Sequence, residues 1–306
     1  MLSEKKDVEY RSLPTRSLLN RCDSRRVPFH WTINPYRGCE YGCKYCYARF
    51  THEFLEIHEL KAFETEIYAK DWSESEFVRQ IRAIRPGQVI GLGTATDPYQ
   101  PAERKFARTR MILECLAGHL RSASLFITSK SDLVSRDADL LKRISERNEV
   151  RVTLTVTSMD LRLTRSVEPF APRSDLRLKC GAELVRQGIA LGVIASPVLP
   201  SLTDSTENLE QVARAAKAAG ADHFGAHALF LKPSAQRVFF PYLQEEFPQH
   251  VKQYERLYGT GAYLRGAYPD LLRVRVDDVR SRVGIQRRDM DRVALPQPPG
   301  TQMQLF

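Results

Sequence analysis

The chain has 306 residues, of which 42% are hydrophobic and 27% charged, an ordinary composition for a globular protein with a sizeable core. No apolar run approaches the roughly 18 residues that a membrane span requires, and the N-terminus lacks the apolar core of a signal peptide. These features argue against the membrane and secreted classes and predict a cytoplasmic protein. The net charge of +9 suits a polyanionic partner, because Lys and Arg gain by releasing phosphate counterions, although many solvated surfaces are equally basic.

Residues 1–28 form a basic N-terminal extension that carries Arg16, Arg21, Arg25 and Arg26. These arginines either line a groove for nucleic acid or cover an ordinary surface, and the residues alone leave both readings open. A strand is predicted next, at residues 30–33.

Three cysteines follow that strand with C-x3-C-x2-C spacing, at Cys39, Cys43 and Cys46. Three thiolates can hold three irons of a [4Fe–4S] cluster and leave the fourth iron without a protein ligand, whereas electron-transfer clusters normally carry a fourth cysteine. The natural ligand for an open iron is S-adenosylmethionine (SAM), which chelates through its amino and carboxylate groups. A zinc site would need four ligands, and three neighbouring cysteines cannot all pair as disulfides. The spacing therefore predicts a cluster.

From residue 88 onward, short β-rich runs alternate with amphipathic helical patterns. Strands are predicted at 88–93, 124–128, 151–156, 191–196 and 223–229, and helices at 103–120, 137–147, 175–187, 207–219 and 241–258. With the strand at 30–33, six βα units result, which indicates an α/β protein with a parallel sheet. The periodicity alone does not distinguish an open doubly wound sheet from a partial barrel. In both, the chemistry lies at the C-terminal ends of the strands.

Polar residues follow two of these strands. Lys130 comes at the end of the third strand, where its charge can pair with the carboxylate of SAM. Thr157 and Ser158 end the fourth strand and offer hydroxyls to a ribose, and Glu168 and Arg177 are candidates to complete the same site.

The cysteine run, with the aromatic Tyr45 just before the third cysteine, resembles the radical SAM enzymes. That resemblance implies a partial (β/α)6 barrel of parallel strands with extended N- and C-terminal segments, and a [4Fe–4S] cluster on the loop after the first strand. It also implies that the segment after the second strand holds the amino group of SAM. Thr96 and Asp97 are therefore cofactor-binding candidates, with a helix cap as the plainer reading.

From about residue 16 to residue 264, the chain resembles the spore photoproduct lyase family, through Trp-Thr-Ile-Asn-Pro-Tyr-Arg-Gly-Cys, Thr-Asp-Pro-Tyr-Gln-Pro-Ala-Glu and Gly-Ala-Tyr-Leu. The resemblance implies hydrogen or electron relay by the tyrosines that flank the last cluster cysteine, Tyr45 and Tyr47, so Tyr47 is the catalytic candidate. One position departs from the family. The lyase has its hydrogen-donor cysteine where this chain has Thr94, and a threonine O–H bond is too strong for that role.

Residues 29–260 are predicted to form the barrel, and residues 261–306 a C-terminal extension with a Pro-rich, extended tail. Its last residues, from Gln302 to Phe306, resemble a peptide that binds the bacterial DNA sliding clamp, and the plainer reading is a frayed terminus.

Three functions are compatible with these patterns. The first is a radical SAM enzyme of the lyase class that acts on nucleic acid, with flavodoxin or ferredoxin as its electron donor. The second is the same chemistry on a peptide or small molecule, and the third is a non-catalytic iron–sulfur protein that binds nucleic acid. The candidates Thr96, Asp97 and Lys130 argue against the third.

Overall fold

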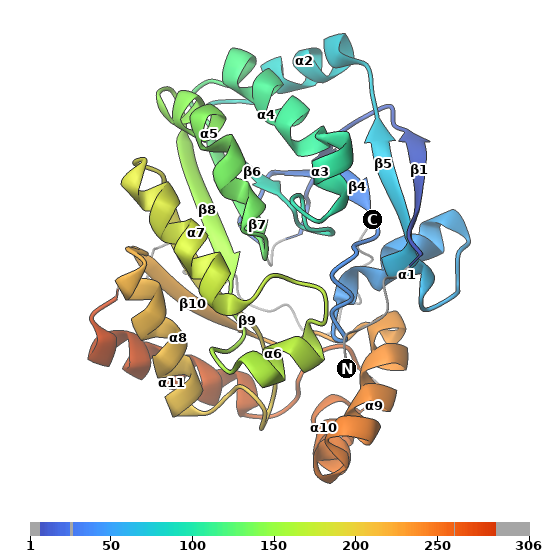
Figure 1. Ribbon diagram of the computed structural model, residues 1–306, viewed down its shortest axis with the longest axis vertical. Coiled ribbons are helices and arrows are strands. Elements are labelled where there is room, and N and C mark those ends of the chain that lie inside the picture. Colours follow the sequence, from blue (N-terminus) through green and yellow to red (C-terminus); the bar gives the residue numbers. More distant parts are fainter. Residues whose placement is uncertain (1–6, 25–26, 260, 286–306) are drawn as a thin grey trace.

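The computed structural model describes residues 7–24, 27–259 and 261–285. Its main sheet holds six parallel strands in the order of the chain (Figure 1): β3 (Trp31–Ile33), β6 (Val89–Leu92), β7 (Ser124–Ser129), β8 (Glu149–Thr155), β9 (Ala190–Val198) and β10 (His223–Ala228). A doubly wound sheet reverses its strand order at a switch point, and no such reversal occurs among these strands. The six predicted strands are confirmed, and their order is that of the expected partial (β/α)6 barrel.

The strands are buried because their sequences are nearly continuous apolar runs, as in β7 with Leu125 and Ile127 and in β8 with Val152 and Leu154. The helices that follow them cover the outer face of the sheet (Figure 1). These helices are α4 (Arg108–His119), α5 (Ala138–Ser145), α7 (Ser174–Arg186) and α8 (Thr206–Ala218). Their apolar faces and the strands share one core.

Two helices that were predicted as continuous are interrupted in the structure. The helix expected at 103–120 is split into α3 (Ala102–Phe106) and α4, because Ala107 adopts a left-handed conformation with φ 50°. The helix expected at 241–258 consists of α9 (Pro233–Glu246), a short turn η3 (Pro248–His250) and α10 (Val251–Tyr258). Pro248 has no N–H to continue the ladder of α9, so the helix ends before it.

The N-terminal extension takes part in the fold. β2 (Leu19–Arg21) pairs antiparallel with β3 at the edge of the main sheet. β1 (Glu9–Pro14) pairs with β5 (Glu66–Asp71), which also pairs with β4 (Tyr36–Arg37), and these three strands form a second sheet beside the barrel (Figure 1). β4 leads directly into the cysteine loop.

The remaining helices connect or close these units. The C-terminal extension contains α11 (Tyr268–Val283), a helix that the sequence reading did not predict, and it packs on α8 and β10. The others are short: η1 (Tyr47–Leu55), α1 (Ala62–Thr65), α2 (Glu74–Arg82), η2 (Leu133–Asp137) and α6 (Leu161–Val167).

Within the described ranges, no helix has the length and apolar character that crossing a bilayer requires. Arg25 and Arg26 of the basic extension lie outside the described residues, as does the peptide from Gln302 to Phe306.

Candidate active site

The cysteine loop is held by hydrogen bonds to three distant segments. The amide of Cys39 donates to the carbonyl of Phe63 (2.8 Å), and the amide of Lys44 donates to the carbonyl of Val167 (3.0 Å). The hydroxyl of Tyr41 donates to the carbonyl of Tyr99 (3.1 Å). Gly38 has φ +82°, and a Cβ there would come within 2.7 Å of a backbone oxygen, so only glycine fits at the loop's entry.

The three predicted ligands lie together in a dry environment. Cys39 and Cys43 are each 8% exposed, and Cys46 is half-buried. Burial raises the pKa of the Cys43 thiol to about 12, and burial followed by the charges of Asp97 and the other two cysteines raises that of Cys39. The three sulfur atoms are therefore close enough to interact electrostatically.

This donor set fits an iron–sulfur cluster better than zinc. Among the residues that the structure describes, no three His, Cys, Asp or Glu side chains converge on a single metal ion. A zinc ion gathers its ligands around one atom, whereas a four-iron cluster distributes its thiolates over separate irons. Cys39, Cys43 and Cys46 would hold three of those irons.

The loop after β6 joins the cysteine loop to the end of β7. Thr96 donates through its hydroxyl to the carbonyl of Gly38 (2.7 Å), and the buried amide of Gln100 reaches the same carbonyl (2.9 Å). Asp97 accepts from the Ser129 hydroxyl (2.8 Å) and from the amide of Lys130 (2.6 Å). Burial raises the pKa of Asp97 despite these donors. Both predicted residues thus position the loops, and their contact with SAM stays a prediction.

A buried charge cluster lies beneath the cysteine loop. Glu168 accepts from the hydroxyls of Tyr45 and Thr157 (2.9 Å for Thr157) and from the guanidinium of Arg177 (2.5 Å). Burial alone would raise the pKa of Glu168, but the charges of Arg177 and Lys130 outweigh it and hold that pKa low. The structure therefore brings these five predicted residues together.

Lys130 is the second cation of this cluster, and its charge acts on Cys43 and Cys46. Its ammonium lies 5.7 Å from the centre of the Tyr45 ring. Burial alone would lower its pKa, but Glu168 and Cys43 outweigh burial and raise it, so the side chain stays charged. A fixed ammonium beside the thiols is well placed for a carboxylate such as that of SAM.

Ser158 contributes differently from Thr157. Its hydroxyl accepts from the amide of Asp160 (3.0 Å), and its carbonyl accepts from Ser174 (2.7 Å). The first bond stabilises the turn into α6, and the second joins the segment that follows β8 to the start of α7. The structure gives no hydrogen bond that places Ser158 in the Glu168 cluster, and the predicted ribose contact stays untested.

Tyr47 lies at the edge of the loop and is 40% exposed. Its hydroxyl donates to the carbonyl of Thr94, the residue that departs from the lyase pattern. The hydroxyl of Thr94 accepts from the amide of Asn34 (3.1 Å) and is thus held away from a relay role. The sequence pointed to Tyr47 through the family resemblance, and Asn34 lies in the Trp-Thr-Ile-Asn-Pro-Tyr-Arg-Gly-Cys motif but was not singled out as a site residue.

Two further aromatic residues, Phe230 and Tyr263, extend from Tyr47, and the sequence analysis did not predict either of them. Phe230 follows β10, and its ring centre lies 5.9 Å from that of Tyr47 and 4.5 Å from that of Tyr263. Tyr263 is 48% exposed and is held near Phe230 because Leu231 donates to the carbonyl of Ala262 (2.9 Å). The Gly-Ala-Tyr-Leu motif was the available signal for Tyr263.

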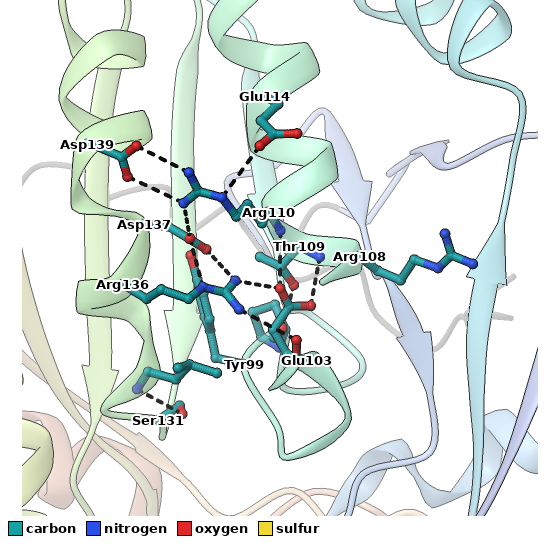
Figure 2. A network of polar contacts seen from close by, with 12 residues as sticks. Tyr99, Glu103, Arg108, Thr109, Arg110, Glu114, Ser131, Arg136, Asp137 and Asp139 are labelled. Carbon is teal, nitrogen blue, oxygen red and sulfur yellow. Dashed lines mark hydrogen bonds and ion pairs between the residues drawn. The ribbon is translucent and has the colours of Figure 1, made fainter. Parts of the chain in front are cut away.

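A second polar cluster, centred on Glu103 of α3, holds the end of the loop that follows β6 (Figure 2). The buried carboxylate of Glu103 accepts from Arg136 (2.6 Å) and from the amide of Thr109 at the start of α4 (2.8 Å). It also accepts from the hydroxyl of Tyr36 on β4 (2.5 Å). Glu103 therefore connects β4, which leads into the cysteine loop, with the loop that carries Thr96 and Asp97.

Comparisons with known proteins agree with this geometry. A spore photoproduct lyase structure with bound AdoMet and dinucleoside spore photoproduct has the same fold, with a TM-score of 0.66 over 90% of this chain and 79% of the lyase chain, at 14% identity. An uncharacterized protein of Mycobacterium tuberculosis is 34% identical over 88% of this chain and 79% of its own length. One from Methanocaldococcus jannaschii is 31% identical, over 77% and 82%.

The family model described as the radical SAM superfamily matches residues 33–222, which include the cysteine loop, the β6 loop, Lys130 and the Glu168 cluster. Members of this superfamily use a [4Fe–4S] cluster and SAM, and the buried thiols and the fixed ammonium of Lys130 suit both cofactors. The chain belongs to the radical SAM superfamily.

Proposed function

We propose that this radical SAM enzyme acts on nucleic acid, with chemistry of the lyase type that repairs damaged DNA. In the superfamily, the cluster supplies the electron that cleaves SAM to methionine and a 5′-deoxyadenosyl radical, which abstracts a hydrogen atom from the substrate. The chain's own residues hold the cofactors, exclude water and orient the substrate.

The observation that carries the nucleic-acid substrate is the aromatic group formed by Tyr47, Phe230 and Tyr263. These three rings come from separate segments and lie in succession beside the cysteine loop, and two of them are about half exposed. Stacking of a base on such a ring contributes about 1–3 kcal/mol and tolerates any base. The net charge of +9 and the dinucleoside bound by the lyase of the same fold support the same substrate class.

Thr94 makes the return of hydrogen in this enzyme different from that in the lyase. No thiol stands at that position, and the threonine hydroxyl is engaged by Asn34. A phenolic O–H bond is weaker than an alcohol O–H bond. Tyr47, which hydrogen-bonds the Thr94 carbonyl, is the proposed relay.

The test is the yield of 5′-deoxyadenosine after reduction of the cluster, with and without UV-irradiated DNA. We expect irradiated DNA to raise the yield and Tyr47→Phe to slow turnover without loss of the cluster. A yield that DNA does not change, but that a peptide or small molecule raises, would favour the second function. If no 5′-deoxyadenosine forms at all, the protein is not a catalyst of this type.

A binding assay isolates the aromatic group. Tyr263→Ala should weaken binding of single-stranded DNA by about fivefold or more, since one stacked base is worth at least about 1 kcal/mol. Leu271→Ala is the control, because Leu271 is an exposed apolar residue on α11, with 61% exposure against 48% for Tyr263. Equal losses in both variants would contradict a stacking role for Tyr263.

The proposed partners follow from this function. Flavodoxin or ferredoxin is the proposed electron donor, and the cytoplasm is the proposed compartment. The peptide from Gln302 to Phe306 is proposed to bind the DNA sliding clamp. Leu305 and Phe306 would each contribute roughly 1.5–3 kcal/mol if buried, so deleting the peptide or changing both to Ala should abolish clamp capture, whereas Met303→Ala should matter less. Equal capture of intact and truncated protein would overturn this proposal.

A further inference from the structure

One face of the second sheet carries three cations, Arg11, Arg37 and Lys70, and Arg37 directly precedes the cysteine loop. Arg37 on β4 lies opposite Tyr68 on β5 in the register of the sheet, and Lys70 is two residues farther along β5 on the same face. Residues in this diagonal relationship are about 7–8 Å apart, which long side chains bridge easily. The opposite face of the sheet is apolar and buried around Tyr36, Ile67 and Ala69.

Within the part of the chain that the structure describes, neither Arg37 nor Lys70 has an acidic partner. On the neighbouring strand, Arg11 is paired with Glu9 (2.7 Å) and Glu66 (3.2 Å). By contrast, no carboxylate in the described ranges forms an ion pair with Arg37 or Lys70, and Arg37 donates instead to the carbonyl of Thr51 (2.9 Å). Burial and the charge of Arg37 lower the pKa of Lys70 to about 8. Two half-buried cations side by side are unfavourable until an anion joins them.

Two aromatic rings on η1, Phe54 and Phe50, lie between Arg37 and a further cation, Lys232. The guanidinium of Arg37 lies 5.8 Å from the ring centre of Phe54, which is 58% exposed. The rings of Phe54 and Phe50 are 5.7 Å apart, and the ammonium of Lys232 lies 3.4 Å from the centre of Phe50. Rings beside cations are the pattern of proteins that bind single-stranded nucleic acid.

The length of η1 sets the distance between Tyr47 and Phe54. At about 2 Å per residue, the seven steps from Tyr47 to Phe54 span about 14 Å. For a strand whose bases are stacked with the rise of duplex DNA, roughly 3.4 Å per nucleotide, that distance corresponds to about four nucleotides. A strand with one base at Tyr47 therefore reaches Arg37 and Lys70 with a phosphate about four nucleotides away.

We propose that Arg37 and Lys70 form a binding site for a backbone phosphate of the nucleic-acid strand whose reacting base lies at Tyr47, which presupposes the nucleic-acid function proposed above. Phe54 stacks a base between this phosphate and the reaction site. The site fixes how far along the strand the enzyme reaches and reads no sequence, because phosphate contacts position a strand without identifying its bases.

The test is the salt dependence of binding of a labelled single-stranded octanucleotide to the cluster-loaded enzyme. Each phosphate contact contributes about 0.7 to the slope of log K against log salt concentration for a single strand. We expect Lys70→Met to reduce the slope by about this amount and to weaken binding about tenfold at low salt. Lys70→Arg should restore both values, which separates loss of charge from misfolding. Lys142→Met, a change of an exposed lysine on α5, should alter neither value.

Two further arms sharpen the result. A dinucleotide is too short to reach Lys70, so its affinity should be equal for wild type and Lys70→Met. Between about pH 7 and pH 9, the wild type should lose affinity as the Lys70 ammonium deprotonates, whereas Lys70→Arg should not. The other charged or titratable groups on this face are Glu9, Arg11, Arg37, Glu66 and Tyr68, and those on η1 are Tyr47, Arg49, His52 and Glu53. The pKa is raised for Tyr47 and Tyr68 and lowered for Glu9 and His52, so none of these four groups changes protonation in that range.

The outcomes separate this inference from the proposed function. If the wild type binds the octanucleotide and Lys70→Met has the same slope, the phosphate site is wrong and the nucleic-acid function stands. If the wild type binds no oligonucleotide, both are wrong. Binding of inorganic phosphate that requires Lys70, with no effect of Lys70 on the octanucleotide, would overturn the proposal in favour of a free-anion site.

Discussion

The hydroxyl of Tyr45 donates a hydrogen bond to the carboxylate of Glu168, which ties the cysteine loop to the segment that follows α6. The other oxygen of that carboxylate accepts from Arg177. Both charged side chains are 1% exposed. The loop that carries the cluster ligands is thus anchored on a buried ion pair, and removing Glu168 leaves the guanidinium of Arg177 without a carboxylate in a dry site.

We expect Glu168→Gln to lower the free energy of unfolding of the cluster-free protein by about 3–5 kcal/mol, because Arg177 becomes an uncompensated buried charge. Tyr45→Phe should cost less, about 1.5–3 kcal/mol, since it removes one hydrogen bond to a charged acceptor. Urea unfolding measures both. Glu183→Gln breaks an exposed pair with Arg186 and should change stability by at most about 1 kcal/mol. Similar losses of unfolding free energy in the three variants would contradict the claim that the buried pair of Glu168 and Arg177 anchors the loop.

The same pair predicts a dependence of stability on pH. The pKa of Glu168 is held below its ordinary value of 4.5 in the folded chain, chiefly by the charges of Arg177 and Lys130, which overcome the effect of burial. Its contribution to stability is therefore complete above pH 4.5 and is lost as the pH falls through the folded value. The gap in unfolding free energy between wild type and Glu168→Gln should narrow below that pH. A gap that stays constant in acid would show that Glu168 is not the titrating group.

Local patterns predicted the strands, which the structure confirms, and the cluster ligands, whose role stays a prediction. Apolar runs such as those around Ile127 and Leu154 identify buried strands without reference to the rest of the chain, and the spacing of Cys39, Cys43 and Cys46 is itself local. The helix break at Pro248 could also have been predicted locally, because proline interrupts a helix. The helical periodicity of the residues on both sides favoured one continuous helix instead.

Contacts over long sequence separations were not predictable in the same way. Glu168 was recognised as a candidate, but its pairing with Tyr45 joins residues 123 positions apart. The second sheet escaped prediction because β4 has two residues and pairs with a strand about thirty positions later, so neither has a periodicity of its own. Gln100 is an ordinary polar residue in sequence, and only its burial against Gly38 reveals its role.

Replacing Cys39, Cys43 or Cys46 by Ala should abolish both the iron content and the visible absorbance of the reconstituted protein, since each is expected to ligate one iron. SAM cleavage should disappear in the same variants. Cys115→Ala is the control, because Cys115 is a half-buried residue on α4, away from the loop, and should leave both readouts unchanged. A full complement of iron in the Cys46→Ala protein would refute its assignment as a ligand.

Replacing Lys130 by Ala should leave the cluster intact and weaken SAM binding by about 1.5–3 kcal/mol, the worth of a hydrogen bond to a charged group. The backbone should not move, because Asp97 holds the Lys130 amide and not its side chain. The variant also removes a cation that lowers the pKa of Glu168, but Arg177 remains and keeps that carboxylate charged. Calorimetric titration of the cluster-loaded protein with SAM measures the effect, and iron content serves as the control. An unchanged SAM affinity would show that the ammonium serves the Glu168 cluster and does not contact the cofactor.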